Sequence, residues 1–151
     1  MTLNSITSDS LSAADANLVP ISRLAFLGDA VMELMVRESL VLHSDRPFRL
    51  LNAQKAGLVS AHAQAEASDR LLPMLDGEEL AVYRRGKNSK HKNYPKTASA
   101  LDYCKATGLE ALMGFLYLKG DAARLRELFS VVVSAENFSP ADGGSPEECD
   151  A

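Results

Sequence analysis

Two acidic residues are notable because each is the lone carboxylate in a short apolar stretch. Asp29 lies within residues 26–31, and Glu110 lies within residues 108–114. A carboxylate on an apolar helix face costs several kcal/mol unless something compensates it. The neighbours of both acids are small, so two helices could approach closely there. This pattern predicts that the two acids converge on one cation.

Mg²⁺ suits such a pair because it binds through few carboxylates and keeps several waters. A bound Mg²⁺ can generate a hydroxide nucleophile and neutralise the charge that builds up on a phosphate. We therefore predict Asp29 and Glu110 as the metal ligands and catalytic residues of a phosphate-processing site. The alternative, from the residues alone, is that each acid caps a helix or pairs with an arginine such as Arg23.

A basic segment of one charge sign lies between the two acids. Residues 84–96 contain six Lys or Arg and one His, and no acid occurs from residue 80 to residue 101. Solvated loops usually mix both signs, whereas a single-sign segment with Asn, Ser and Tyr suits phosphate and ribose contacts. We predict nucleic-acid-binding contacts from Arg84, Arg85, Lys87, Asn88, Lys90, His91, Lys92 and Lys96.

The net charge of −4 conceals this basic character. Residues 1–20 and 135–151 hold seven of the 20 acids and no Lys or Arg, which leaves 13 acids against 16 bases in the rest. An acidic chain of this kind does not exclude an anionic partner.

Length and composition favour one domain in a reducing compartment. No apolar run reaches the ~18 residues of a membrane span, and residues 1–17 lack the pattern of a secretory signal. Cys104 and Cys149 have no metal-ligand spacing. We expect a cytoplasmic domain at residues 18–134, with a disordered N-terminus at 1–17 and a disordered acidic tail at 135–151.

Helical periodicity covers the chain without a convincing strand pattern, so the predicted fold is all-α. The first helix spans residues 21–42, with a core stripe through Leu24, Val31 and Leu34. A different side of this helix is also apolar, which is typical of a helix that is central in a bundle or shared with a second subunit. We predict Phe26 at a dimer interface.

The remaining elements are also expected to be helices. Residues 47–72 are predicted as one helix, and Asp76 as the start of a capping box for the next, which Gly86 would end. Thr97 is the expected cap of a long helix that ends at Gly120.

Four stretches resemble the ribonuclease III family, in order and spacing, and are most similar to its mini-ribonuclease III subfamily. They are Arg23–Leu34, Lys55–Ala61, Tyr83–Lys90 and Thr107–Leu118. The resemblance covers about residues 18–134 and leaves only the two acidic ends outside.

This resemblance implies an all-α endonuclease that forms a two-fold homodimer and cuts double-stranded RNA with Mg²⁺. The signature Asp of the family matches Asp29, and the Glu of its second motif matches Glu110. No double-stranded-RNA-binding domain is expected after residue 134. The subfamily implies the large-subunit (23S) ribosomal RNA precursor as substrate, cut to 5′-phosphate and 3′-hydroxyl ends, in the cytoplasm or, in a plant, the plastid stroma. A ribosomal protein on that RNA is a candidate partner.

Two positions depart from the larger enzymes of the family. These enzymes carry acids where this chain has Ala25 and Thr107, each about one turn before the matching catalytic acid. The mini subfamily also has nonacidic residues there, so the departures fit its character.

Two rival hypotheses remain open at this level. A catalytically weak or inactive protein of the same fold could bind RNA or act as a scaffold, and the missing acids favour it. A helical dimerisation module without nucleic acid is the third. The retained Asp29 and Glu110 favour the nuclease.

Overall fold

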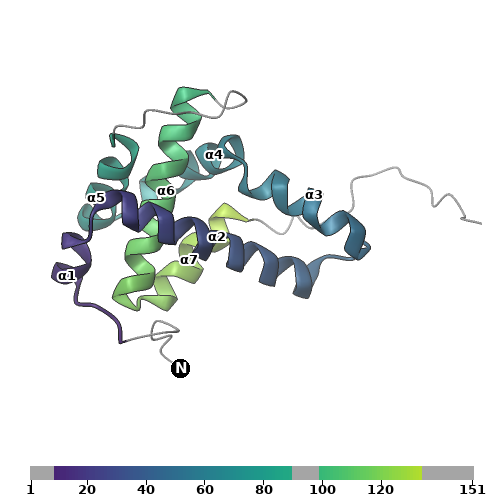
Figure 1. The fold of residues 1–151 in the computed structure, drawn as a ribbon, viewed down its shortest axis with the longest axis horizontal. Helices are drawn as coiled ribbons and strands as arrows, with labels where there is room; N and C mark the ends of the chain where they lie inside the picture. Colours follow the sequence, from purple (N-terminus) through teal and green to yellow (C-terminus); the bar gives the residue numbers. More distant parts are fainter. Residues whose placement is uncertain (1–8, 90–98, 134–151) are drawn as a thin grey trace, which may run out of the picture.

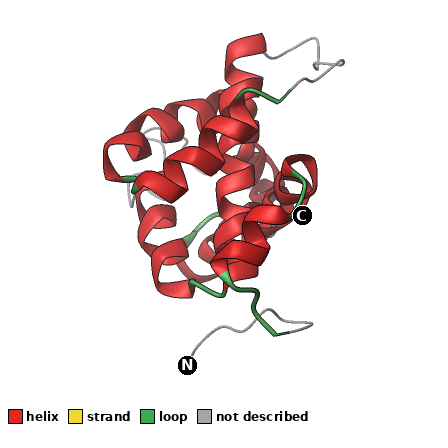
Figure 2. Cartoon of the chain, turned by 90° about the vertical axis from the view of Figure 1, so that its left-hand side faces the viewer, coloured by secondary structure: helices red, strands yellow, loops and turns green. Residues whose placement is uncertain are grey.

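The computed structural model describes residues 9–89 and 99–133, and every regular element in these ranges is a helix (Figure 1). The all-α prediction is confirmed, and a view from the side shows helices joined by short loops (Figure 2). The elements are α1 (Ala13–Leu18), α2 (Ile21–His43), α3 (Phe48–Val59), α4 (Ala61–Leu71), the 3₁₀ helix η1 (Leu72–Met74), α5 (Gly77–Lys87), α6 (Ala100–Lys119) and α7 (Ala122–Val132).

Helix α6 is the centre of the bundle and contacts α1, α2, α4, α5 and α7. Ten of its residues between Ala106 and Leu116 are buried, which is the mark of a helix surrounded on all sides. Gly120 ends it in a left-handed conformation (φ 74°), as predicted, and its N–H bonds the carbonyls of Leu116 and Tyr117. None of the described helices combines the length and apolar character needed to cross a bilayer.

Helices α2 and α6 touch backbone to backbone at two glycines. A Cβ at position 28 would overlap the main-chain carbonyl of Glu110, and one at position 114 would overlap the carbonyl of Leu24. Only residues without a side chain allow this approach. The contact therefore fixes the parts of α2 and α6 that carry Asp29 and Glu110.

A buried ion pair joins α5 to α7 at the far side of the bundle. The capping box predicted at Asp76 is confirmed, with Glu79 as its third residue and only 2% exposed. Arg124 donates two hydrogen bonds of 2.8 Å to the Glu79 carboxylate and a third of 2.6 Å to the carbonyl of Met74. These hydrogen bonds from Arg124 hold the pKa of Glu79 below its usual value.

The core face of α2 differs from the predicted stripe. Leu24 and Val31 are buried as predicted, but Leu34 is 53% exposed. The buried face is instead centred on Gly28 and Met32. The prediction followed the spacing of large apolar residues, whereas the close approach of α6 at Gly28 decides which side of α2 is buried.

Three predicted helix limits are also wrong or lie elsewhere. Residues 47–72 do not form one helix, because Ser60 adopts an extended conformation and its hydroxyl caps α4. Helix α5 continues past Gly86 to Lys87, and Gly86 lies so close to α6 that a Cβ there would come within 2.8–2.9 Å of Ala111 and Gly108. Ser99 caps α6, and the expected cap, Thr97, lies outside the described residues.

The folded part begins earlier than the expected boundary at residue 18. Ser12 caps α1, and Ala16 on this helix is fully buried. The N–H of Leu11 donates to the carbonyl of Leu118 at 2.7 Å. Residues 9–17 are therefore ordered against α6, while residues 1–8 and 134–151 lie outside the described residues.

Candidate active site

Asp29 and Glu110 lie in one cavity of about 300 Å³ between α2 and α6. The prediction that the two acids come together is therefore met by the geometry. Helical spacing explains the arrangement, because residues three or four apart share a face. The lining consists of Ser22, Ala25, Phe26 and Asp29 from α2, and of Tyr103, Thr107 and Glu110 from α6.

The two carboxylates have different surroundings. Asp29 is exposed to solvent, so the expectation of a buried acid at that position is wrong. Glu110 is partly buried, and burial, followed by the negative charge of Asp29, raises its pKa to about 7. A hydrogen bond from Gln64 acts in the opposite direction and lowers that pKa. The pair is thus held together against its own repulsion by the packing of the helices.

No protein cation neutralises this pair within the described part of the chain. The cavity lining contains no Lys or Arg, and neither acid takes part in an ion pair there. The alternative in which Arg23 pairs with Asp29 is not observed. Two carboxylates in one cavity without a cationic partner suit a hard divalent cation, which would remove their repulsion. The donor set is small, since no cluster of three acids, His or Cys occurs among residues 9–89 and 99–133.

Ala25 and Thr107 face the cavity as expected from their spacing. The Thr107 hydroxyl donates to the carbonyl of Tyr103 at 3.0 Å, one turn earlier on α6. These two positions therefore present to the cavity a methyl group and a hydroxyl that is already engaged. A cation here would keep more of its waters.

Glu33 has a structural role outside the cavity. Its carboxylate accepts from Arg37 at 2.8 Å and from Lys55 at 2.9 Å, so it links α2 to α3. These two partners lower the pKa of Glu33, with Lys55 first. Glu33 is thus engaged in ion pairs with Arg37 and Lys55 and does not line the cavity of Asp29.

The basic segment is described only in part. Arg84 and Asn88 are exposed near the end of α5, and Lys87 is half-buried. Arg85 donates to the backbone and side-chain oxygens of Asn17 at 3.3 and 3.4 Å, which ties α5 to α1. Lys90, His91, Lys92 and Lys96 lie outside the described residues.

Phe26 borders the cavity and is 84% exposed. An aromatic ring so open to water next to two acids is consistent with the predicted contact surface.

Gln64 is the neighbour of the acids that the sequence analysis missed. It is 2% exposed on α4, and its amide contacts Glu110 at 3.3 Å. Its spacing to Ala61, Ala65 and Ser68 puts it on the inner face of α4, and a polar residue on that face is the signal that could have revealed it.

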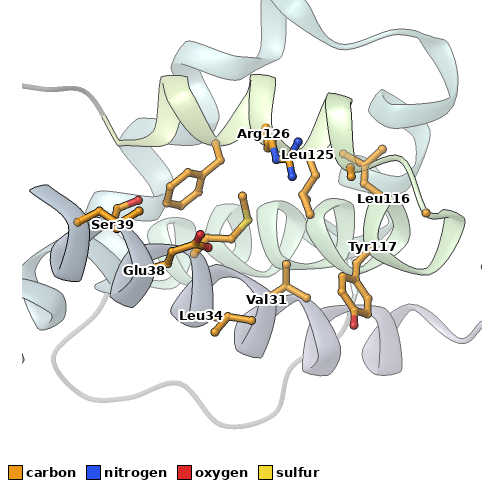
Figure 3. A pocket seen from close by; sticks show the side chains of 13 residues that line it. Val31, Leu34, Glu38, Ser39, Leu116, Tyr117, Leu125 and Arg126 are labelled. Carbon is orange, nitrogen blue, oxygen red and sulfur yellow. The ribbon is translucent and has the colours of Figure 1, made fainter. Parts of the chain in front are cut away.

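A second cavity of the described molecule lies elsewhere. It has a volume of about 430 Å³, lies among α2, α6 and α7, and contains neither Asp29 nor Glu110 (Figure 3). Its lining is mainly apolar, with Glu38 and Arg126 as its charged residues. This lining therefore lacks the paired carboxylates of the cavity between α2 and α6.

Residues 22–121 match the family model of the ribonuclease III domain, and this range contains both acids. The chain belongs to the ribonuclease III family. The match and the relatives below show that it is an endoribonuclease. The resemblance drawn from the four sequence stretches is thereby confirmed.

Relatives agree over most of their length. A mini-ribonuclease 3 from Thermoanaerobacter sp. is 40% identical over 73% of this chain and 78% of its own. One from Synechococcus sp. is 42% identical over 78% of this chain and 83% of its own. A crystal structure of a protein from Fusobacterium nucleatum is 30% identical, with a TM-score of 0.72, and covers 81% of this chain and 98% of its own.

The pKa of Glu110 predicts how stability depends on pH without metal. Between its ordinary pKa of 4.5 and the folded value of about 7, the folded state keeps a proton that the unfolded state releases. Stability should therefore fall as pH rises from 4.5 to 7 and level off above. We expect Glu110→Gln to be more stable than wild type by about 1–3 kcal/mol at pH 8, with the difference shrinking towards pH 5. Urea unfolding in a chelator at four pH values measures this.

Glu33→Gln is the matched control, because the ion pairs of Glu33 lower its pKa instead of raising it. This variant should gain no stability at any of these pH values. A stability difference between Glu110→Gln and wild type that does not change with pH would contradict the raised pKa of Glu110.

Proposed function

We propose that the protein is a Mg²⁺-dependent endoribonuclease that hydrolyses double-stranded RNA to 5′-phosphate and 3′-hydroxyl ends. The observation that supports it most directly is the cavity shared by Asp29 and Glu110, which no Lys or Arg of the described residues neutralises, in a chain of the ribonuclease III family. An acidic cavity of this kind repels RNA phosphate unless a cation is bound between the two carboxylates and the phosphate.

The two acids would hold the cation, and the rest of the lining would order water. Mg²⁺ bound there supplies a hydroxide from a bound water and neutralises charge on the phosphate. Glu110 must release its proton to become a ligand, which is easier once a cation has replaced the repulsion of Asp29. The hydroxyls of Ser22 and Tyr103 lie on the same lining and are suited to hydrogen bonds with water.

RNA binding would rest on the basic segment at the end of α5. Arg84, Lys87 and Asn88 are on the described part, with Arg85, Lys90, His91, Lys92 and Lys96 as the further proposed contacts. Duplex RNA exposes phosphates and 2′-hydroxyls in preference to readable base edges, so these contacts would select shape. Arg85 also serves α1, so its share in RNA binding would be smaller.

We also propose a two-fold homodimer. Helix α3 has no buried residue, and even its aromatic residue Phe48 is exposed. The outer side of α2 exposes Phe26 and Val41 to 84% and 76%. Exposed apolar patches of this kind mark interaction surfaces. A two-fold axis would give two cavities, one for each strand of a duplex.

The substrate that we propose is the large-subunit (23S) ribosomal RNA precursor in the cytoplasm, with a ribosomal protein on that RNA as a candidate partner. Support comes from the relatives called mini-ribonuclease 3, which align over 78% and 83% of their length. It is a proposal about the substrate alone, and duplex cleavage does not depend on it.

Asp29→Asn should abolish cleavage and leave folding and RNA binding intact. Loss of the metal's charge stabilisation is worth several kcal/mol, and 1.36 kcal/mol is about tenfold in rate, so a fall of ~10³-fold or more is expected. Product formation with Mg²⁺ is measured on the terminal stem of the ribosomal precursor and on an unrelated duplex. The control is Glu33→Gln, an acid one turn away that is engaged with Lys55, and it should cut like wild type.

Unchanged cutting by Asp29→Asn would rule out the assignment of the site. Wild-type protein that binds the duplex but does not cut it with Mg²⁺ would favour the alternative, a catalytically inactive RNA-binding protein with a nuclease fold.

Replacing Lys87, Lys90 and Lys92 by Gln should weaken duplex binding at low salt. Each lost phosphate contact removes about one unit from the slope of log affinity against log salt. We therefore expect a slope flatter by roughly two to three units, measured by fluorescence anisotropy at several salt concentrations. If affinity and slope both stay at wild-type values, the basic segment does not bind the RNA.

Phe26→Asp should dissociate the dimer, because a charge would replace an aromatic ring at the centre of the proposed contact. Sedimentation equilibrium at micromolar concentration measures the mass, with 16.3 kDa expected for one chain. Leu18→Asp is the control, since Leu18 is exposed to a similar extent, 81%, on α1. A wild-type mass of one chain would refute the dimer.

A further inference from the structure

Gln64 is a buried amide whose two observed hydrogen bonds point in different directions. Its Nε2 donates to the carbonyl of Val59 at 3.0 Å and to Oε1 of Glu110 at 3.3 Å. Both acceptors are oxygens, so a rotated amide would place its own oxygen against a carbonyl and a carboxylate. The orientation of the carboxamide is therefore determined by its neighbours.

A purely structural role explains only one of these two bonds. Val59 is the last residue of α3, and its carbonyl is one of the acceptors that a helix end leaves without a partner. The second bond reaches across 46 positions of sequence to an acid of the candidate site. The amide oxygen Oε1 of Gln64 is buried and has no partner within the described residues. A side chain chosen only to cap α3 would not need to bury this oxygen.

The bond to Glu110 restricts the carboxylate on one side. Gln64 occupies Oε1, and among the described residues no hydrogen bond to Oε2 of Glu110 is found. The carboxylate thus keeps one oxygen available in a cavity that it shares with Asp29.

We propose that Gln64 is a positioning residue, which holds the Glu110 carboxylate in the orientation that binds the divalent cation. This inference rests on the proposed metal site. In a site with two acids, each ligand contributes a large share of the affinity, so the orientation of Glu110 matters more than it would in a site with four. Groups that hydrogen-bond to a metal ligand typically change metal affinity or activity by 10–100-fold.

The experiment compares two variants of the full chain. Gln64→Met keeps the length of the side chain and removes both the oxygen and the NH₂ of the amide. Ser68→Ala is the control, because Ser68 is equally buried one turn later on α4 and donates to the carbonyls of Gln64 and Lys105 without touching Glu110. Calorimetric titration with Mn²⁺, without RNA, gives the affinity of each variant. Circular dichroism and melting temperature measure the fold.

We expect Mn²⁺ to bind about tenfold more weakly to Gln64→Met and within twofold of wild type to Ser68→Ala. The Mg²⁺ concentration for half-maximal cleavage should rise by the same factor, with KM for the duplex unchanged. Wild-type Mn²⁺ affinity in Gln64→Met, or an equal loss in both variants, would overturn the inference. Wild-type protein that binds no Mn²⁺ would overturn the metal site itself, and the inference with it.

A measurement on the wild-type protein covers the case in which Gln64→Met does not fold. The side-chain NH₂ signals of Gln64 in a ¹⁵N–¹H NMR spectrum should shift as Mg²⁺ is added, since the bonded carboxylate becomes a ligand. The shift should saturate with the Mg²⁺ affinity of the site. If the Gln64 signals stay in place while signals of other residues shift with Mg²⁺, Gln64 does not act on the metal ligand.

Discussion

The contact between α2 and α6 is the constraint on which the rest of the structure depends. At Gly28 the backbone of α2 lies against the main-chain carbonyl of Glu110, and at Gly114 the backbone of α6 lies against that of Leu24. The residue after Gly28 is Asp29, so the point of closest approach and the acidic pair are the same place. Any side chain at position 28 would push the two acids apart, because the overlap is with backbone.

The packing of α2 against α6 holds the two negatively charged groups, Asp29 and Glu110, near each other despite their repulsion. Without a cation, burial and the negative charge of Asp29 disfavour the ionised form of Glu110 and raise its pKa. The buried face of α6 offsets that cost. A divalent cation between the two acids would replace their repulsion with attraction and would favour the ionised form of Glu110.

Sequence was sufficient for what depends on local chemistry, and insufficient for what depends on close packing. The all-α fold, the capping box at Asp76 and the end of α6 at Gly120 follow from periodicity and capping, which act within a few residues. The core face of α2 and the role of Gly86 do not follow from these local patterns, because both are set by the backbone of another helix. The two acids were found from their isolation in apolar stretches, although Asp29 is exposed rather than buried.

Gln64 shows why a site is harder to predict than its principal ligands. An acid in an apolar stretch is unusual at the level of sequence, whereas a Gln in an Ala-rich helix is ordinary, since Gln is a good helix former. Its meaning arises only when the break at Ser60 turns α4 against α6 and brings the amide to Glu110. The same break leaves the carbonyl of Val59 to be satisfied. One amide thus contacts both the end of α3 and the acid on α6, two places that are far apart in the sequence.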